Sequence, residues 1–99
     1  MYFITIVKMR ENNEIDEAKT IGYVSEISEA DRCVRENVSD MFLGGQYQYA
    51  IICEVGTGIF PEIRNMQWYD YTIDEDYWIN IKKCNTPEGL EEFTPYIMG

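Results

Sequence analysis

The sequence offers few residues that could do chemistry, and the densest group of them is acidic. Asp74, Glu75 and Asp76 are consecutive, and Asp70 precedes Asp74 by four residues. A calcium loop needs alternating oxygen ligands, a glycine at its sixth position and a distant bidentate glutamate. The residues from Tyr77 onward instead have the composition of a β-strand. The cluster therefore indicates a solvated acidic hairpin turn and not a metal site.

Nucleophilic and acid-base catalysis lack the partners they need. The chain contains no histidine, which removes Ser-His-Asp and Cys-His sites together with the commonest metal ligand. Glu54 is the best single candidate for a general acid or base, but no second carboxylate can be paired with it. Cys33 and Cys53 lie in apolar patterns typical of core thiols, and only Cys84 has lysines beside it. We therefore expect no catalytic residue, metal ligand or cofactor, and predict that the protein is not an enzyme.

The charge balance restricts the partners. Eight Lys and Arg residues stand against 18 Asp and Glu residues, a formal net charge of −10. Binding to nucleic acid depends on cations that neutralise phosphates, so direct binding to nucleic acid or to an anionic membrane is disfavoured. No apolar stretch approaches the roughly 18 residues that span a bilayer. Three cysteines without a metal or redox spacing, and a start without a basic leader, predict a reducing, cytoplasmic location.

Aromatic residues gather between positions 68 and 78. Five of them are Trp68, Tyr69, Tyr71, Tyr77 and Trp78. Tyrosine and tryptophan are enriched at protein interfaces because they supply large contact area at low entropic cost, although a role in the core is the alternative. Strand alternation places neighbouring residues on opposite faces, so both faces are partly aromatic and one helix cannot bury them all.

The surrounding elements follow from periodicity. We predict a hairpin of strands 2–9 and about 19–24 around a polar loop, residues 10–17. A helix over about 29–43 is indicated by Ser28 as N-cap, by acids in the first turn and by a terminating Gly44-Gly45. Its buried stripe comprises Ala30, Cys33, Val34, Val38, Met41 and Phe42.

The second half of the chain predicts a central strand over 46–55 and a hairpin of strands 66–73 and 77–84 around the acidic turn. A short turn at Thr86-Pro87-Glu88 and an apolar tail, 93–98, follow. The order β-β-α-β-β-β in 99 residues indicates a single α+β domain, residues 1–99, with a mostly antiparallel sheet of about five strands and one amphipathic helix packed on one face. The opposite face is then either exposed or buried in a homo-oligomer or a partner.

Several segments together resemble small uncharacterised acidic proteins of gut Firmicutes, their phages and their mobile elements. The segments are Tyr2 to Lys8, Gly22-Tyr23, Ser28-Glu29-Ala30, Tyr49 to Ile52, and Gln67-Trp68-Tyr69. The resemblance covers nearly the whole chain and implies a setting, because short acidic proteins of phages and mobile elements are often inhibitors of host defence. It implies no catalytic residue.

Two binding functions follow as hypotheses. The first is an anti-defence inhibitor of the anti-CRISPR kind, which docks on a basic surface of a host nuclease or effector and loosely mimics nucleic acid. Its expected contact residues are Trp68, Tyr69, Asp70, Tyr71, Asp74, Glu75, Asp76, Tyr77 and Trp78 on the hairpin, with Glu36 and Asp40 on the helix. The alternative is an oligomeric sponge for a nucleotide signal, in which aromatic residues stack on a base and Arg64, Lys82 or Lys83 meets a phosphate.

Overall fold

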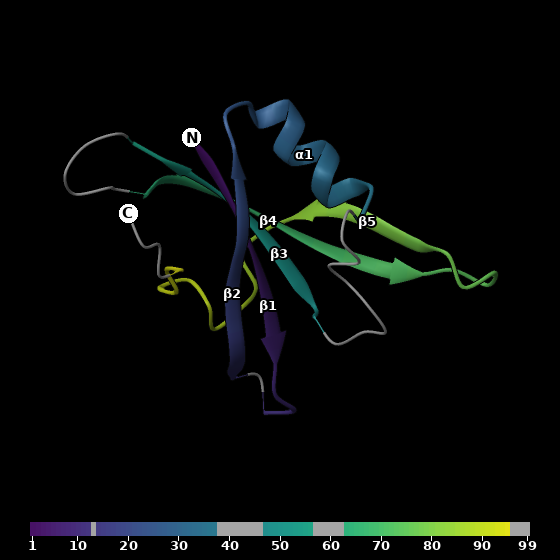
Figure 1. Cartoon of the computed structure of the whole chain (residues 1–99). Helices are drawn as coiled ribbons and strands as arrows, with labels where there is room; N and C mark the ends of the chain where they lie inside the picture. The colour runs from purple at the N-terminus through teal and green to yellow at the C-terminus, as the bar shows by residue number, and fades with distance from the viewer. Residues whose placement is uncertain (13, 38–46, 57–62, 96–99) are drawn as a thin grey trace.

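The computed structural model describes residues 1–12, 14–37, 47–56 and 63–95. Within them the chain forms five strands and one helix (Figure 1). The elements are β1 (Tyr2–Met9), β2 (Ile15–Val24), α1 (Ile27–Arg35), β3 (Tyr49–Val55), β4 (Ile63–Ile73) and β5 (Ile79–Cys84). This confirms the predicted α+β fold, with an antiparallel sheet and a helix packed on it.

The strands form one sheet in the order β2-β1-β3-β4-β5. Every neighbouring pair is antiparallel, and β3 lies at the centre as predicted. Five of the seven residues of β3 are buried, because a central strand of this kind is covered on both faces. β2 begins at Ile15, four residues before the predicted start, so the connecting loop is shorter than its polar composition indicated.

The sheet has an apolar cluster on each face. On the helix side, Ala30 and Val34 of α1 pack on the strands. The other buried members of this cluster are Ile4, Ile6, Ala50, Ile52 and Tyr69. The opposite cluster comprises Val7, Ile51, Cys53, Val55, Trp68 and Leu90. Alternation along each strand thus sends neighbouring residues into different cores.

The helix is shorter than predicted. α1 begins at Ile27 and its N-cap is Glu26, whose side chain makes no capping hydrogen bond, so the prediction of Ser28 as N-cap is wrong. It ends at Arg35, because Asn37 adopts the left-handed conformation with φ 51° and stops the helical hydrogen bonding. The rest of the predicted helix, residues 38–43, and the predicted Gly44 terminus lie outside the described residues.

A polar contact fastens α1 to the sheet beneath it. The Tyr69 hydroxyl donates a hydrogen bond of 2.5 Å to Asp31 Oδ1, and Arg35 Nε donates to both carboxylate oxygens of Asp31 at 3.0 and 2.9 Å. The Arg35 guanidinium also lies 5.9 Å from the centroid of the Tyr69 ring. Burial by itself would raise the pKa of Asp31, but these hydrogen bonds and the charge of Arg35 outweigh it and hold that pKa below its ordinary value.

The C-terminal segment, residues 87–95, covers the face that the helix leaves open. Leu90 is buried against this face, and the Phe93 ring packs at 6.2 Å from the Trp68 ring. The segment and α1 lie on opposite sides of the strands (Figure 1). The expectation that the second face is exposed or buried in another chain is therefore wrong for its centre, where Trp68 is 1% exposed.

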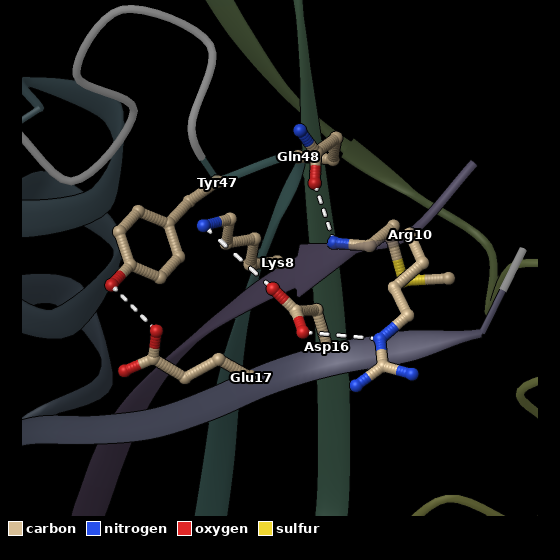
Figure 2. Close-up of polar contacts among 7 residues, drawn as sticks. Lys8, Arg10, Asp16, Glu17, Tyr47 and Gln48 are labelled. Carbon is tan, nitrogen blue, oxygen red and sulfur yellow. Dashed lines mark hydrogen bonds and ion pairs between the residues drawn. The ribbon is translucent and has the colours of Figure 1, made fainter.

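The edge strand β2 is irregular at Asp16, where the pairing with β1 shifts register between Lys8 and Met9. The Asp16 carboxylate lies between two cations of the same hairpin, 3.7 Å from Lys8 Nζ and 3.1 Å from Arg10 Nε (Figure 2). Bulges and charges at an edge strand disfavour pairing with a further strand. Among the described residues no helix is long and apolar enough to cross a membrane.

We expect the substitution Tyr69→Phe to lower the free energy of unfolding by about 1.5 kcal/mol, because it removes a hydrogen bond to a charged group. The folded state lowers the pKa of Asp31 below its ordinary value of 3.8, so ionised Asp31 stabilises the fold above about pH 4 and this contribution disappears as the pH falls through the lowered pKa. Urea unfolding at pH 7 and pH 3 measures both effects. Equal stability of Tyr69→Phe and the exposed control Tyr23→Phe at pH 7 would contradict the prediction.

We expect Leu90→Ala to destabilise the protein by about 2 to 3 kcal/mol, because it opens a cavity under the C-terminal segment. It should also admit water to Trp68. In a Trp78→Phe background Trp68 is the remaining tryptophan, and its emission should shift to longer wavelength in the Leu90→Ala variant. An unchanged emission maximum and unfolding midpoint would show that the segment does not cover this face.

Candidate functional site

The candidate site is the tip of the β4–β5 hairpin, residues 73–78, which we call the hairpin tip. The hairpin extends away from the rest of the molecule (Figure 1), whose principal extents are 47, 30 and 20 Å. Three large apolar side chains are exposed here: Ile73 by 55%, Tyr77 by 87% and Trp78 by 71%. Neither α1 nor the C-terminal segment reaches far enough to cover them.

Asp74 organises the hairpin tip. Its Oδ1 accepts hydrogen bonds from the backbone N–H groups of Asp76 at 2.9 Å and Trp78 at 3.0 Å, and its Oδ2 accepts one from Asn80 Nδ2 at 3.4 Å. The bond from the Trp78 N–H, followed by those from Asn80 and Asp76, holds the pKa of Asp74 below its ordinary value. Aspartate commonly orders turns in this way. The tip is therefore an ordered turn, and the predicted acidic hairpin turn is confirmed.

Tyr77 adopts a backbone conformation that does not suit it. Its φ is 64°, the left-handed region in which glycine is at ease and other L-residues are strained. Its backbone N–H nevertheless donates to the carbonyl of Asp74 at 3.0 Å, and the Asp74 N–H donates to the carbonyl of Trp78 at 3.1 Å. This geometry turns the Tyr77 side chain outward, where it packs on almost nothing.

The negative charge of the hairpin tip is not compensated locally. The four ion pairs among the described residues join Lys8 and Arg10 to Asp16, Arg32 to Glu36, and Arg35 to Asp31. None of them involves Asp74, Glu75 or Asp76. The tip thus presents three carboxylates and two exposed aromatic rings within six residues, the composition of an interface hot spot bordered by acids.

Two sequence-predicted contact residues do not belong to this surface. Trp68 and Tyr69 are each 1% exposed, so the prediction that they contact a partner is wrong. Trp68 is covered by the C-terminal segment, whose position on this face the sequence did not indicate, and Tyr69 is covered by α1. Ile73 was missed, although its position at the end of a strand beside the acidic turn could have indicated it.

The remaining predicted residues lie at different distances from the hairpin tip. Asp70 and Tyr71 are half-buried on β4, just before the tip. Glu36 lies at the end of α1 and is paired with Arg32 at 2.7 Å, so its charge is already balanced. Asp40 lies outside the described residues. The structure therefore concentrates the candidate site on one hairpin and leaves the helix as a separate surface.

The three cations proposed for the nucleotide sponge do not converge within one chain. Lys82 and Lys83 are neighbours on β5, opposite Asp70 and Tyr69 of β4, so their side chains leave opposite faces of the sheet. Arg64 lies five residues from Tyr69 along β4, about 17 Å away in an extended strand. It packs instead against Gly56.

Two of the cysteine thiols, Cys53 and Cys84, are held in their neutral form. Burial raises the pKa of Cys53 to about 11, and burial together with the charge of Asp70 raises that of Cys84 to about 11. Both thiols are therefore protonated at neutral pH and poor nucleophiles. Within the described ranges, no group of three His, Cys, Asp or Glu side chains is arranged to hold a metal ion.

Comparison with protein families, with curated proteins and with solved structures finds no match for this chain.

We expect Tyr77→Gly to raise the free energy of unfolding by about 1 kcal/mol, because glycine adopts the left-handed conformation without strain. Asp74→Ala should instead lower it, because two backbone N–H groups at the tip lose their acceptor. Urea unfolding measures the change in the free energy of unfolding of each variant. Glu75→Ala is the exposed control, because its side chain makes no turn contact. A Tyr77→Gly variant less stable than the wild type would show that the tyrosine side chain serves the fold.

Proposed function

We propose that this protein is a non-enzymatic binding protein that docks on a basic surface of a partner protein through its hairpin tip. The observation that carries the proposal is Tyr77. Its backbone has a positive φ that strains a tyrosine and its side chain is 87% exposed, so the ring contributes little to folding. Strain of this kind concentrates at functional sites, and here it presents an aromatic ring to an incoming surface.

Trp78 and the acids beside it support the same assignment. Tryptophan and tyrosine dominate the binding energy of protein interfaces when a partner removes them from water. The uncompensated charge of Asp74, Glu75 and Asp76 attracts a cationic partner and repels an anionic one. Such charge accelerates association and makes it sensitive to salt. A partner with a basic groove fits both the aromatic and the acidic parts of the tip.

The partner class that we propose is a nuclease or effector of a host defence system. A nuclease carries a basic groove for nucleic acid, and an acidic protein that occupies it would inhibit cleavage as a loose mimic of the nucleic-acid charge. The net charge of −10 and the resemblance to small acidic proteins of phages and mobile elements support this choice. The proposed site of action is the cytoplasm of the host cell, where such nucleases work.

We expect the wild-type protein to inhibit cleavage by at least one enzyme in a panel of purified phage-defence nucleases from gut Firmicutes, and to do so less well as the salt concentration rises. Trp78→Ala should weaken binding to that enzyme by about 2 kcal/mol, or about thirtyfold in Kd, if the ring is buried on docking. Cleavage assays and calorimetric titrations at low and high salt measure both effects.

The matched control is Tyr23→Ala, which removes an aromatic ring that is 63% exposed on β2, away from the hairpin tip. It should bind within about twofold of the wild type, because residues outside a hot spot contribute little. Inhibition that is indifferent to salt, or a Trp78→Ala variant as active as the wild type, would refute docking through the tip. Absence of inhibition across the panel would refute the proposed partner class.

A further inference from the structure

A shallow depression lies beside the hairpin tip, between β4 and the residues that lead into β3. The described residues that line it are Gln48, Tyr49, Asp70, Tyr71 and Ile73. Ile73 is also the first residue of the hairpin tip, so the depression and the tip form one continuous surface. Asp70 precedes Asp74 by four residues, about 13 Å along an extended strand.

The depression contains an unsatisfied acceptor. Asp70 Oδ1 is buried and has no hydrogen-bond partner. Lys82 lies opposite Asp70 in the β4–β5 pairing, but its ammonium group is not within ion-pair distance of the carboxylate. A carboxylate oxygen that has left water without gaining a donor costs free energy in the unbound protein. Rotation of the Asp70 side chain toward the depression brings this oxygen within reach of a ligand's donor, which removes that cost.

The charge of Asp70 acts on the two titratable groups beside it, Tyr49 and Cys84. Burial, the neighbouring Cys84 and the charge of Asp70 together raise the pKa of Tyr49, and burial with Asp70 raises the pKa of Cys84. Both groups stay neutral at pH 7, so neither competes with a ligand for the carboxylate as a cation would. An anion is repelled by the same charge, which excludes a nucleotide phosphate from this depression.

The walls of the depression are held in place before any ligand arrives. The side-chain oxygen of Gln48 accepts a hydrogen bond of 2.7 Å from the backbone N–H of Met9 (Figure 2). The backbone N–H of Gln48 donates to the carbonyl of Val7 at 3.0 Å. The Tyr49 ring packs edge-on against Trp68 at 5.7 Å. Asp70 itself lies within the paired part of β4. A site built on strands in this way loses little entropy on binding.

We propose that this depression receives the side chain of an arginine from the partner, with the guanidinium group on the Asp70 carboxylate and its plane against the ring of Tyr49, which lies on the same face of the sheet as Asp70. The inference rests on the proposed function and names the partner chemistry at one point of the same surface. Arginine fits better than lysine because its planar fork donates several N–H bonds in fixed directions and stacks on aromatic rings.

The test uses a small probe and needs no knowledge of the partner. N-acetyl-arginine amide is titrated into the full-length wild-type protein and followed by two-dimensional NMR of backbone amides. We expect shifts at residues 48–49 and 70–73. N-acetyl-citrulline amide has the same shape without the charge, and it should bind at least about tenfold more weakly, because an ionic hydrogen bond is lost.

Asp70→Asn should likewise weaken binding of the arginine probe by about tenfold, while its unfolding midpoint stays equal to or above that of the wild type because an unpaired charge has been removed. Glu88→Gln, an exposed acid on the C-terminal segment, is the charge-matched control and should bind as the wild type does. Where Asp70→Asn fails to fold, the citrulline comparison on the wild-type protein decides.

The inference is overturned by an arginine probe that shifts no residue of the depression, or that binds no better than its citrulline counterpart. Either result leaves docking through the hairpin tip intact, because the Trp78→Ala and salt experiments do not involve Asp70. Conversely, selective binding of the arginine probe alongside a fully active Trp78→Ala variant would support the depression and refute the tip.

Discussion

Both faces of this sheet are apolar, and the chain has little material with which to cover them. β3 carries Ile51 and Ile52 side by side, one in each core, and β4 does the same with Trp68 and Tyr69. Since neither face can remain in water without loss of the hydrophobic free energy, two covers are required. The described chain supplies a helix of nine residues on one face and the segment 87–95 on the other. Both covers are short, so the long β4–β5 hairpin extends past them and its end cannot be buried within the chain.

Strand alternation and composition were sufficient to predict the antiparallel sheet, its central strand and the acidic turn. Each of these depends on a pattern of residue types within a short stretch of the sequence. Helix length was not predictable in the same way. The apolar stripe continues beyond Arg35 in sequence, yet a left-handed Asn37 ends the helix, and the periodicity of the stripe does not report the backbone conformation of that residue. The burial of Trp68 depends on a contact with Phe93, 25 positions away in the chain. A contact between such distant positions cannot be predicted from the periodicity of either segment.

At the hairpin tip, the residue that orders the turn is not one of the residues that expose aromatic rings. Asp74 gives the turn its order through its carboxylate, so the turn does not need a particular side chain at position 77. The sequence shows that an acidic turn with aromatic neighbours exists, but it cannot show that Tyr77 has a positive φ, since tyrosine is not a residue expected there. The strain is visible only in the structure. Together with its exposure, the strain distinguishes Tyr77 from the aromatic residues that the two cores bury.

The positions of the cations decide which of the acidic side chains remain unpaired. The described ion pairs balance acids at the β1–β2 loop and along the helix, where Lys8, Arg10, Arg32 and Arg35 are used. The acids from Asp70 to Asp76 have no such partners. Mutual repulsion among them is tolerated because three point into water from a projecting turn, where the high dielectric constant weakens it. The ion pairs elsewhere in the described chain leave this repulsion uncompensated, so a cationic surface brought to this hairpin would relieve it beside the exposed rings of Tyr77 and Trp78.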